Sequence, residues 1–407
     1  MSASHAHDAG TTSAWLRELL ADRLGLAHDA IDADARLHRY GLTSLTAAAI
    51  VTAIAERTGR ALAPTLVWDY PTLNRLAGFL DGRPDAEARP PMMPLAADDP
   101  IAIVGMACRF PGAESIDAYW RMLGAETDAI REVPADRWPI ERLYDPDPLA
   151  PGRMATRWGG FLDRVDAFDA AFFGMSPREA AQADPQQRLA LELAWESLED
   201  AAIRPSRLLG SRTGVFLGAM WSDYARLLAD RDGIAQHTAT GQDISIISAR
   251  IAYTLGLEGP ALTIDTACSS ALVAVHQACQ SLRSGETTVA LAGGVHLVLA
   301  PESSIAMTKF GAMAPDGRCK AFDSRANGYV RGEGGGVVVL KPLSAARADG
   351  DRVYAVIRGS AMNNDGPSNG LTAPNPAAQR GMLRDALAAA RVHPHDVDYV
   401  EAHGTGT

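Results

Sequence analysis

ALTIDTACSSALVAVHQACQSLRSG, residues 261–285, is the stretch around which the rest of the chain is organised. It begins with a short apolar run at 261–264, which is typical of a buried strand. After a break at 265–268 it continues as a helix that is apolar around nearly its whole circumference. We therefore expect this helix to lie inside a large core. Cys268 falls at the strand-to-helix turn.

Cys268 has two interpretations. The unpaired N–H groups and the positive dipole end of a following helix would stabilise a thiolate and a developing oxyanion, which favours a nucleophile. Most free cysteines, however, are small buried apolar residues. The pattern of residues 261–285 leaves both interpretations open.

Composition narrows the class of protein. The 407 residues are 47% hydrophobic and 21% charged, as in ordinary globular proteins, and they are enough for two or three domains or one large one. The formal net charge of −11 argues against a nucleic-acid binder. The four cysteines show neither disulfide nor zinc spacing, so we expect no metal. No segment is typical of a signal peptide or a membrane span, which predicts a cytoplasmic protein.

The first 98 residues predict a small all-α bundle and a linker. We expect residues 1–11 to be disordered and residues 12–82 to form three main helices. Thr12 or Ser13 is the predicted cap of the first helix. Leu45 belongs to the predicted apolar face of the second helix, and Pro71 is the predicted first residue of the last. The proline-rich residues 83–98 predict a semi-rigid linker.

From residue 99 onward, strand and helix patterns alternate, which predicts a mostly parallel sheet between helices. The predicted strands are 101–105, 213–217, 261–264, 289–298 and 337–341, and the predicted helices are 116–123, 177–202, 243–255 and the one after Cys268. A second round of strand (353–359), helix (377–390) and strand (397–402) follows. The glycines at 332–336 lack the spacing of a dinucleotide-binding loop.

Two hydrolase patterns can be set aside. Residues 366–370, GPSNG, match G-x-S-x-G, but Asn and Asp precede them and prolines follow, so they predict a loop rather than a nucleophile elbow. A Cys268–His403 pair could suggest a papain-like protease. The local signature of that family is missing around Cys268, and its cysteine lies near the mature N-terminus.

Five motifs resemble the β-ketoacyl synthase domains of modular (type I) polyketide synthases. They are DTACSSAL at 265–272, DPIAIVGMACRFPG at 99–112, ADPQQRLALELAWESLEDA at 183–201, NGYVRGEGGG at 327–336 and EAHGTGT at 401–407. The resemblance covers residues 99–407. It implies an α/β thiolase-like fold of two similar halves, of which the second is incomplete here.

The bundle resembles an acyl or peptidyl carrier protein through YGLTSL at 40–45 and PTLVWDYPTLNRLAGFL at 64–80. The resemblance implies covalent attachment of 4′-phosphopantetheine to the Ser44 hydroxyl by a phosphopantetheinyl transferase. A helix N-terminus suits the attached phosphodiester. Carriers usually have Asp before this serine, and Thr43 stands there. Thr43 can cap the helix but lacks the charge, so recognition by the transferase is the property in question.

The same resemblance assigns the chemistry. Cys268 would accept an acyl chain from an acyl-loaded carrier and condense it, as an acyltransferase, with a malonyl-type extender held on a carrier protein. His403 would stabilise charge on the extender's thioester oxygen, and Thr405 and Thr407 would hold the pantetheine arm. A complete synthase domain is expected to be a homodimer. The family's second histidine and its lysine would lie beyond residue 407, so we expect a fragment that does not condense. The alternative is a carrier module with an inactive synthase that serves as a docking scaffold.

Overall fold

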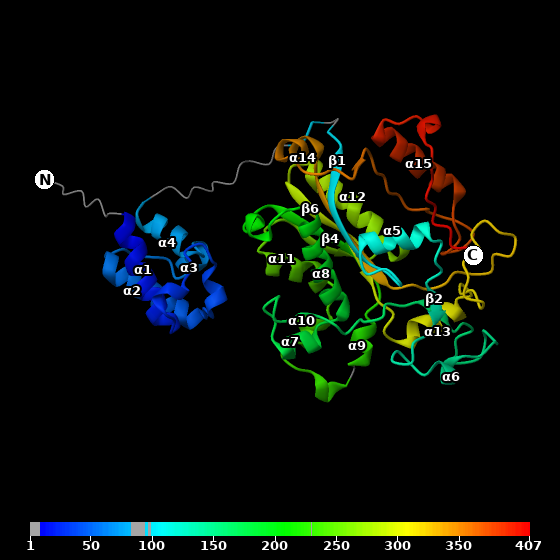
Figure 1. The fold of residues 1–407 in the computed structure, drawn as a ribbon, viewed down its shortest axis with the longest axis horizontal. Helices are drawn as coiled ribbons and strands as arrows, with labels where there is room; N and C mark the ends of the chain where they lie inside the picture. The colour runs from blue at the N-terminus through cyan, green and yellow to red at the C-terminus, as the bar shows by residue number, and fades with distance from the viewer. Residues whose placement is uncertain (1–8, 83–93, 97–98, 229) are drawn as a thin grey trace. The chain divides into compact units, whose positions relative to one another are not determined.

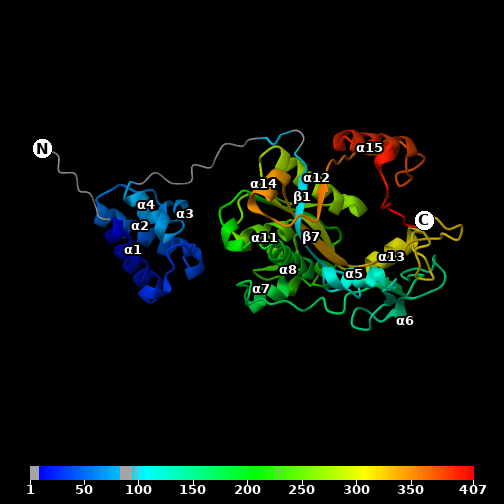
Figure 2. The same ribbon diagram turned by 45° about the horizontal axis from the view of Figure 1, so that its top comes forward.

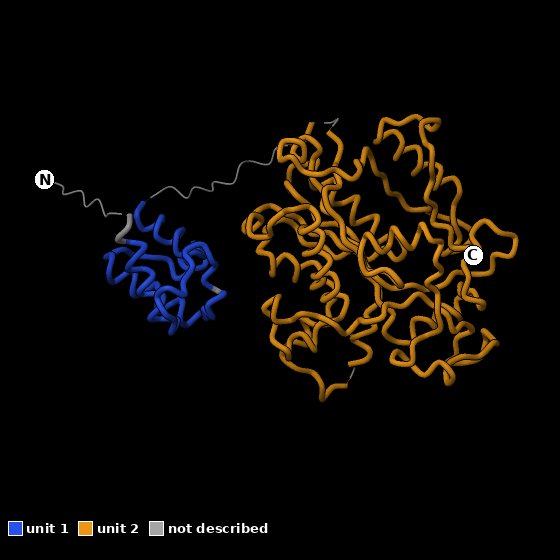
Figure 3. The backbone as a smooth tube through the Cα atoms, in the orientation of Figure 1, with its two compact units in different colours: residues 1–91 blue, residues 92–407 orange. Residues whose placement is uncertain are grey.

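The computed structural model describes residues 9–82, 94–96, 99–228 and 230–407, in two compact units of residues 1–91 and 92–407 (Figure 3). The predicted disordered segment lies outside the described residues up to residue 8, as does most of the predicted linker. Leu95, within the predicted linker, belongs to the second unit: its side chain packs on an apolar core of that unit, and its N–H donates to the Arg283 carbonyl (2.9 Å). None of the described helices is long and apolar enough to cross a membrane.

The first unit is an all-α bundle around one apolar core. Its helices are α1 (Ala9–Leu24), α2 (Ser44–Thr58), the single turn α3 (Leu66–Asp69) and α4 (Leu73–Leu80), with 3₁₀ turns at His28–Ala30 and Leu37–Tyr40. Leu16, Leu20, Ile50, Ile54 and Leu76 are fully buried at its centre. The bundle therefore has a core of its own.

Three details of this unit differ from the predictions. α1 begins at Ala9, so Thr12 is a buried residue within the helix and not its cap. α4 is capped by Thr72, whose hydroxyl accepts from Arg75 N (3.2 Å), and Pro71 lies outside the helix. Leu45 is 83% exposed, because the buried face of α2 is formed by Ala47, Ile50, Val51 and Ile54.

The second unit is built on a six-stranded sheet (Figure 1). Its strand order is β5 (Ala261–Ile264), β4 (Thr213–Gly218), β6 (Val289–His296), β7 (Gly334–Pro342), β1 (Ile101–Arg109) and β8 (Ala355–Ile357). A two-stranded sheet, β2 (Ile130–Glu132) with β3 (Trp158–Gly160), lies outside it. The other helices of this unit, apart from those described below, are α5 (Ile116–Gly124), α6 (Ile140–Leu143), α9 (Asp223–Leu227), α10 (Thr238–Gln242), α13 (Pro301–Lys309) and α14 (Leu343–Asp349).

The sheet is mixed, which corrects the prediction of a mostly parallel sheet. β4 pairs in parallel with β5 and β6, but β7 lies antiparallel between β6 and β1, and β8 is antiparallel to β1. Strand and helix alternation reveals the parallel part, because parallel neighbours need crossover helices. It does not reveal that the chain turns back after residue 300.

Helices cover both faces of this sheet (Figure 2). α8 (Pro185–Asp200) and α11 (Ile246–Leu255) share one apolar core with the sheet, and α12 (Ser270–Arg283) packs on the other face. The prediction that α12 lies inside a core is wrong for this structure. Ala274 and Ala278 are fully buried, while Leu272, on the opposite side of the helix, is 77% exposed. The described residues bury α12 on one side only.

The predicted single helix 177–202 is two helices, α7 (Pro177–Gln182) and α8. Pro185 is the first residue of α8, where the missing N–H of proline costs no hydrogen bond. Asp184 caps α8 by accepting from Gln186 N (2.8 Å). A proline within an apolar helical pattern therefore marked a new helix start.

The second round of elements is only partly present. β8 adds to the edge of the first sheet, and α15 (Pro376–Ala390) matches the predicted helix. Residues 397–402 form no strand, since none of the described strands lies beside them to pair with. Gly334, Gly335 and Gly336 are the first residues of β7. Gly293 on β6 leaves room for the Gly336 carbonyl, because a Cβ at 293 would lie 2.0 Å from that oxygen.

Candidate active site

Cys268 lies at the turn between β5 and α12, as predicted from the sequence. It is exposed and belongs to a 3₁₀ turn, Ala267–Ser269. Ala267 has a φ of +56°, which costs a residue with a Cβ about 1 kcal/mol. Asp265 Oδ1 accepts from Ala267 N (2.9 Å), and Ser270 Oγ donates to the Ala267 carbonyl (2.6 Å). These bonds hold the left-handed turn that presents the thiol at the surface.

The thiol opens into a cavity of about 460 Å³ at the carboxyl ends of β4 and β6. Besides Cys268, Ser270 and His296, its walls are apolar residues or glycine, and Phe110, Met220, Leu272, Val275 and Val295 are among the larger side chains. The cavity is lined by no Asp, Glu, Lys or Arg of the described chain. Such a lining suits an uncharged, largely aliphatic group next to the sulfur.

His296 is the histidine that lines this cavity, and both of its ring nitrogens have partners. Nδ1 lies 3.3 Å from the Met220 carbonyl, which can only accept, so Nδ1 carries the proton. Nε2 then accepts from Arg331 Nη2 (3.1 Å). Burial, and secondly Arg331, lower the pKa of His296 to about 4. The ring is neutral at pH 7 and fixed as a structural residue.

Residues 401–407 lie in coil, and His403 is exposed. The Gly406 carbonyl accepts from Gly328 N (3.0 Å), and the hydroxyls of Thr405 and Thr407 are 2.9 Å apart. The described residues that line the Cys268 cavity do not include His403, Thr405 or Thr407. The structure therefore leaves their joint action with Cys268 as a prediction.

Tyr329 directly follows the glycine that contacts residues 401–407. It follows Gly328, whose φ of +138° and close approach to Ala314 N require glycine. Burial raises the pKa of the Tyr329 hydroxyl, the Arg331 guanidinium lowers it, and Cys268 and Cys319 raise it again. The hydrogen bond from Gly328 N to the Gly406 carbonyl therefore ties residues 401–407 to the backbone directly before Tyr329.

A buried carboxylate organises the end of the sheet next to this cavity. Glu333 is fully buried and accepts two hydrogen bonds from Arg137 (3.0 and 2.7 Å). It also accepts from Leu162 N (2.7 Å) and Val298 N (2.9 Å). One side chain therefore ties together the start of β7, the segment after β6 and the segment after β3.

Sequence reasoning missed Tyr329, Arg331 and Glu333 as individual residues. In the sequence, the string NGYVRGEGGG carries a family resemblance but no local pattern that assigns a role to these three residues. Its signal is two charged residues among glycines directly before an apolar strand, where burial demands that charges be paired.

Ser44 is the first residue of α2 and is exposed to solvent. Thr43 caps the helix by accepting from Thr46 N (3.2 Å), as the sequence suggested. A phosphodiester on the Ser44 hydroxyl would meet the positive end of α2 and solvent. These residues therefore fit a covalently attached phosphopantetheine.

Family comparisons agree with this division of the chain. Residues 98–346 match "Beta-ketoacyl synthase, N-terminal domain", residues 354–407 its C-terminal domain, and residues 14–80 "Phosphopantetheine attachment site". The attachment-site match implies covalently bound 4′-phosphopantetheine.

Relatives of this chain include two different subunits of the phenolphthiocerol/phthiocerol polyketide synthase from Mycobacterium tuberculosis. One of them is 56% identical over 315 residues, which is 77% of this chain and 20% of the relative. The other is 48% identical over 399 residues, which is 97% of this chain and 21% of the relative. The chain thus spans about a fifth of the length of these relatives.

Solved structures similar to the second unit are ketosynthases. An oxazolomycin ketosynthase domain from Streptomyces albus JA3453 matches with a TM-score of 0.73 and 44% identity, over 76% of this chain and 54% of that one. The module 6 ketosynthase of the bacillaene synthase from Bacillus subtilis 168 matches with a TM-score of 0.70 and 44% identity, over 76% and 52%. The chain therefore belongs to the β-ketoacyl synthase family of polyketide synthases, with a phosphopantetheine attachment domain ahead of the thiolase-like synthase fold.

Proposed function

We propose that this chain contributes a carrier and an acyl-accepting synthase site to polyketide biosynthesis. The observation that carries the proposal is the exposed Cys268 at the β5–α12 turn, opening into an uncharged cavity of about 460 Å³. A phosphopantetheine arm on Ser44 would supply a thiol that carries acyl groups as thioesters. The Cys268 sulfur attacks the thioester carbonyl of an acyl donor, and the donor thiol leaves with the proton.

The condensation step rests on the resemblance and on the site. A malonyl-type extender, held on a carrier, loses carbon dioxide, and the resulting enolate attacks the acyl group on Cys268. His403 would donate a hydrogen bond to the extender's thioester oxygen as charge develops there. Thr405 and Thr407, whose hydroxyls already contact each other, would hold the pantetheine arm.

The proposed partners follow from this chemistry. They are acyl-loaded carrier domains, a malonyl-loaded carrier and a phosphopantetheinyl transferase that modifies Ser44. We also propose a homodimer for the complete synthase domain and a cytoplasmic location. The latter is supported by cysteines that are all free.

Acyl transfer to Cys268 can be tested directly. The purified chain is incubated with the hexanoyl thioester of N-acetylcysteamine, and acylated peptides are identified by mass spectrometry. Cys319 is the matched control, since it is the other exposed cysteine. We expect Cys319→Ala to keep the label at position 268 and Cys268→Ala to lose it. Equal labelling of Cys268→Ala and wild type would refute the assignment, and no labelling of either would favour the docking-scaffold alternative.

Transfer between the two units is a separate test. With Ser44 loaded by a transferase and acyl-coenzyme A, we expect the acyl group to move to Cys268 in wild type. It should stay on the carrier in Cys268→Ala. Retention on the carrier in both chains would mean that this carrier does not serve this synthase site.

A further inference from the structure

Besides the thiol, two polar side chains are among the described residues that line the Cys268 cavity: Ser270 and His296. The chemistry proposed above gives neither of them a part. If Cys268 accepts acyl chains, as proposed, what these two side chains can still offer decides which acyl chains the cavity favours.

The Ser270 hydroxyl is engaged in the turn that presents Cys268. Its Oγ accepts from Thr266 N (2.8 Å) and donates to the Ala267 carbonyl (2.6 Å). A hydroxyl has one proton, so Ser270 has none left to donate to an acyl chain. The residue is also 5% exposed, so most of it is covered.

Both ring nitrogens of His296 are engaged as well. Nδ1 donates to the Met220 carbonyl, and Nε2 accepts from Arg331 Nη2. A neutral imidazole has one donor nitrogen and one acceptor nitrogen, so both capacities are used. His296 therefore has no free nitrogen to bind an oxygen of the acyl chain.

Arg331 holds His296 in this state. Arg331 is 8% exposed, and its Nη1 donates to the hydroxyls of Ser303 and Ser304 (2.7 and 2.8 Å). Ser303 donates in turn to the buried carboxylate of Asp223 (3.3 Å). A guanidinium stays protonated, so this anchored donor keeps Nε2 of His296 occupied.

The main chain along the cavity wall is paired in the sheet. The wall includes the ends of β4 and β6 and the start of β7, and these strands pair with one another. Ala219, directly after β4, donates its N–H to the Ile264 carbonyl (3.1 Å). Backbone groups that are bonded within a ladder are not available to a bound chain.

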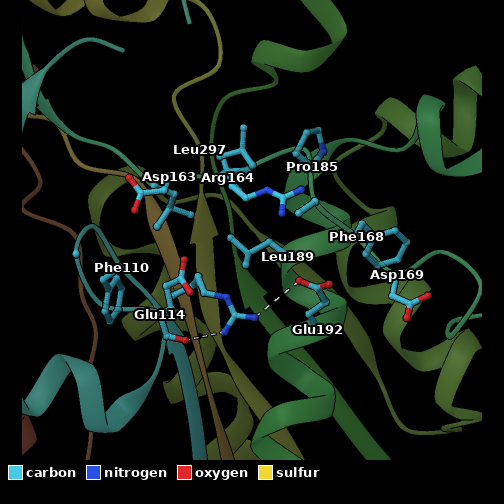
Figure 4. Close-up of a pocket in the computed structure, with 15 residues that line it drawn as sticks. Phe110, Glu114, Asp163, Arg164, Phe168, Asp169, Pro185, Leu189, Glu192 and Leu297 are labelled. Atoms are coloured by element: carbon cyan, nitrogen blue, oxygen red, sulfur yellow. Dashed lines mark hydrogen bonds and ion pairs between the residues drawn. The ribbon is translucent and has the colours of Figure 1, made fainter. Parts of the chain in front are cut away.

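Phe110 is shared with a second cavity, of about 590 Å³, whose walls are charged (Figure 4). The charged residues of that cavity include Arg164 and Glu192, and neither lines the Cys268 cavity. Phe110 packs closely on β7, since a Cβ at Gly334 would lie 2.9 Å from its ring. The Cys268 cavity therefore has an apolar ring where its neighbour has ions.

We propose that Cys268 favours acyl chains without an oxygen on the β-carbon, and that Arg331 is a positioning residue for this preference because it occupies His296. A β-hydroxyl or β-keto oxygen would lose its hydrogen bonds to water in the cavity and find its polar side chains already engaged. An apolar pocket of this kind disfavours an added hydroxyl by about tenfold to a hundredfold.

This preference defines the class of reactions that must supply the acyl chain. A β-ketoacyl thioester would first be reduced at the β-carbon by a hydride donor, such as a nicotinamide nucleotide, together with a proton. The resulting β-hydroxyl would then leave as water to give an alkene. A simple fatty acyl thioester meets the same requirement without either step.

The test measures acylation of Cys268 in the full chain by three thioesters of N-acetylcysteamine: hexanoyl, 3-hydroxyhexanoyl and 3-oxohexanoyl. In each case the Cys268 sulfur takes the acyl group, and N-acetylcysteamine leaves with the proton. Initial rates are measured by mass spectrometry and divided by the rates with N-acetylcysteine, which corrects for the reactivity of each thioester. We expect the corrected hexanoyl rate to exceed the other two by about tenfold or more.

Val275→Thr adds a hydroxyl to the cavity wall with little change of shape. Its proton can be donated to the Ala271 carbonyl one turn earlier, which leaves oxygen lone pairs for the hydroxyl of a substrate. The corrected 3-hydroxyhexanoyl rate should rise about tenfold relative to hexanoyl. The 3-oxo substrate, which needs a donor, should gain less. Val273→Thr is the matched control, since Val273 belongs to the same helix but does not line the cavity.

Arg331→Met frees Nε2 of His296 as an acceptor and should raise the same ratio. The ratio compares two substrates on one protein, so a loss of stability alone does not change it. Val275→Thr tests the cavity independently of whether Arg331→Met folds.

Equal corrected rates for the three thioesters in wild type would overturn the proposal. So would an unchanged ratio in a folded Val275→Thr chain, because an added acceptor must help if a missing partner is the cause. An unchanged ratio in a folded Arg331→Met chain would refute the role of Arg331. Failure of all three thioesters to label Cys268 would refute the acyl-acceptor function itself, and the preference with it, so the two failures can be told apart.

Discussion

Replacing Glu333 by Gln should destabilise the synthase unit severely, although the two side chains have nearly the same shape. The Glu333 carboxylate is fully buried and accepts four hydrogen bonds, two of them from Arg137, whose side chain is 6% exposed. Gln at this position has no charge, and its amide nitrogen can only donate, so it would face at least one donor. The Arg137 charge would stay buried without its partner, which typically costs about 3–5 kcal/mol.

The double variant Arg137→Met, Glu333→Met separates the ion pair from the backbone contacts. For an isolated buried ion pair, replacement by apolar residues is often neutral or stabilising. Here the Leu162 and Val298 N–H groups would also lose their acceptor, at about 1–3 kcal/mol each. We therefore expect the double variant to remain less stable than wild type by about 2–6 kcal/mol.

Urea unfolding followed by circular dichroism measures both changes, and hydrogen exchange at the Leu162 and Val298 amides reports on the contacts themselves. Both amides should exchange faster in each variant. A double variant as stable as wild type, with these amides still protected, would refute the reasoning, because it would mean that Glu333 does not organise the backbone around it.

Four further predictions concern the titration of two buried groups, the packing of one glycine and the modification of Ser44. Burial keeps His296 neutral in the folded chain down to about pH 4, whereas an unfolded histidine takes up a proton below about pH 6.5. His296 therefore contributes about 3 kcal/mol to the free energy of unfolding above pH 6.5, and this contribution is lost as the pH falls towards 4. The urea midpoint of His296→Gln should vary less over this range than that of the wild type. Asp184 has the opposite pH dependence, because burial raises its pKa from 3.8 to about 6. The stability that it contributes is present at low pH and is lost as the pH rises through 6, which opposes the effect of His296. Asp184→Asn can still cap α8, so stability should rise more steeply between pH 4 and 6 in this variant, and an unchanged slope would contradict the assignment. Gly293→Ala should lower stability by about 1–3 kcal/mol or more in thermal unfolding, because the new Cβ meets the Gly336 carbonyl, whereas Gly332→Ala meets open space and should be nearly neutral. Thr43→Asp places a negative charge at the N-terminus of α2 and should stabilise this helix by about 0.3–1 kcal/mol. Intact-mass measurements should also show faster addition of one phosphopantetheine arm than in the wild type, with Ser44→Ala as the unmodified control. An unchanged rate would show that the transferase does not recognise this charge.

Local patterns were sufficient for much of the fold. The turn at Cys268 follows from an apolar run that ends in DTACS, and the start of α2 follows from Thr43. Periodicity does not encode which strand lies beside which, so it could not show that β7 runs between β6 and β1. It also could not show that α12, apolar on nearly every side, has one face uncovered by the described residues.

The candidate site was only partly accessible to sequence reasoning. Cys268 and Ser44 stand at the starts of helices, where the chemistry can be argued from neighbours in the sequence. The pairing of Glu333 with Arg137 spans 196 positions, and the contact of Arg331 with His296 depends on how the segment before β7 meets the end of β6. Such contacts are set by tertiary packing, which a local pattern does not record.

Leu95 has a consequence for where this protein can be cut and rejoined. Its side chain packs against the buried core beneath α12, to which Ala278 and Leu282 of that helix belong, and its N–H donates to the carbonyl of Arg283, the last residue of the helix. A synthase domain that is exchanged between assembly lines at residue 98 would leave this apolar contact behind. A junction placed before Pro94 would carry Leu95 along with its core, and the recombined domain would keep this contact.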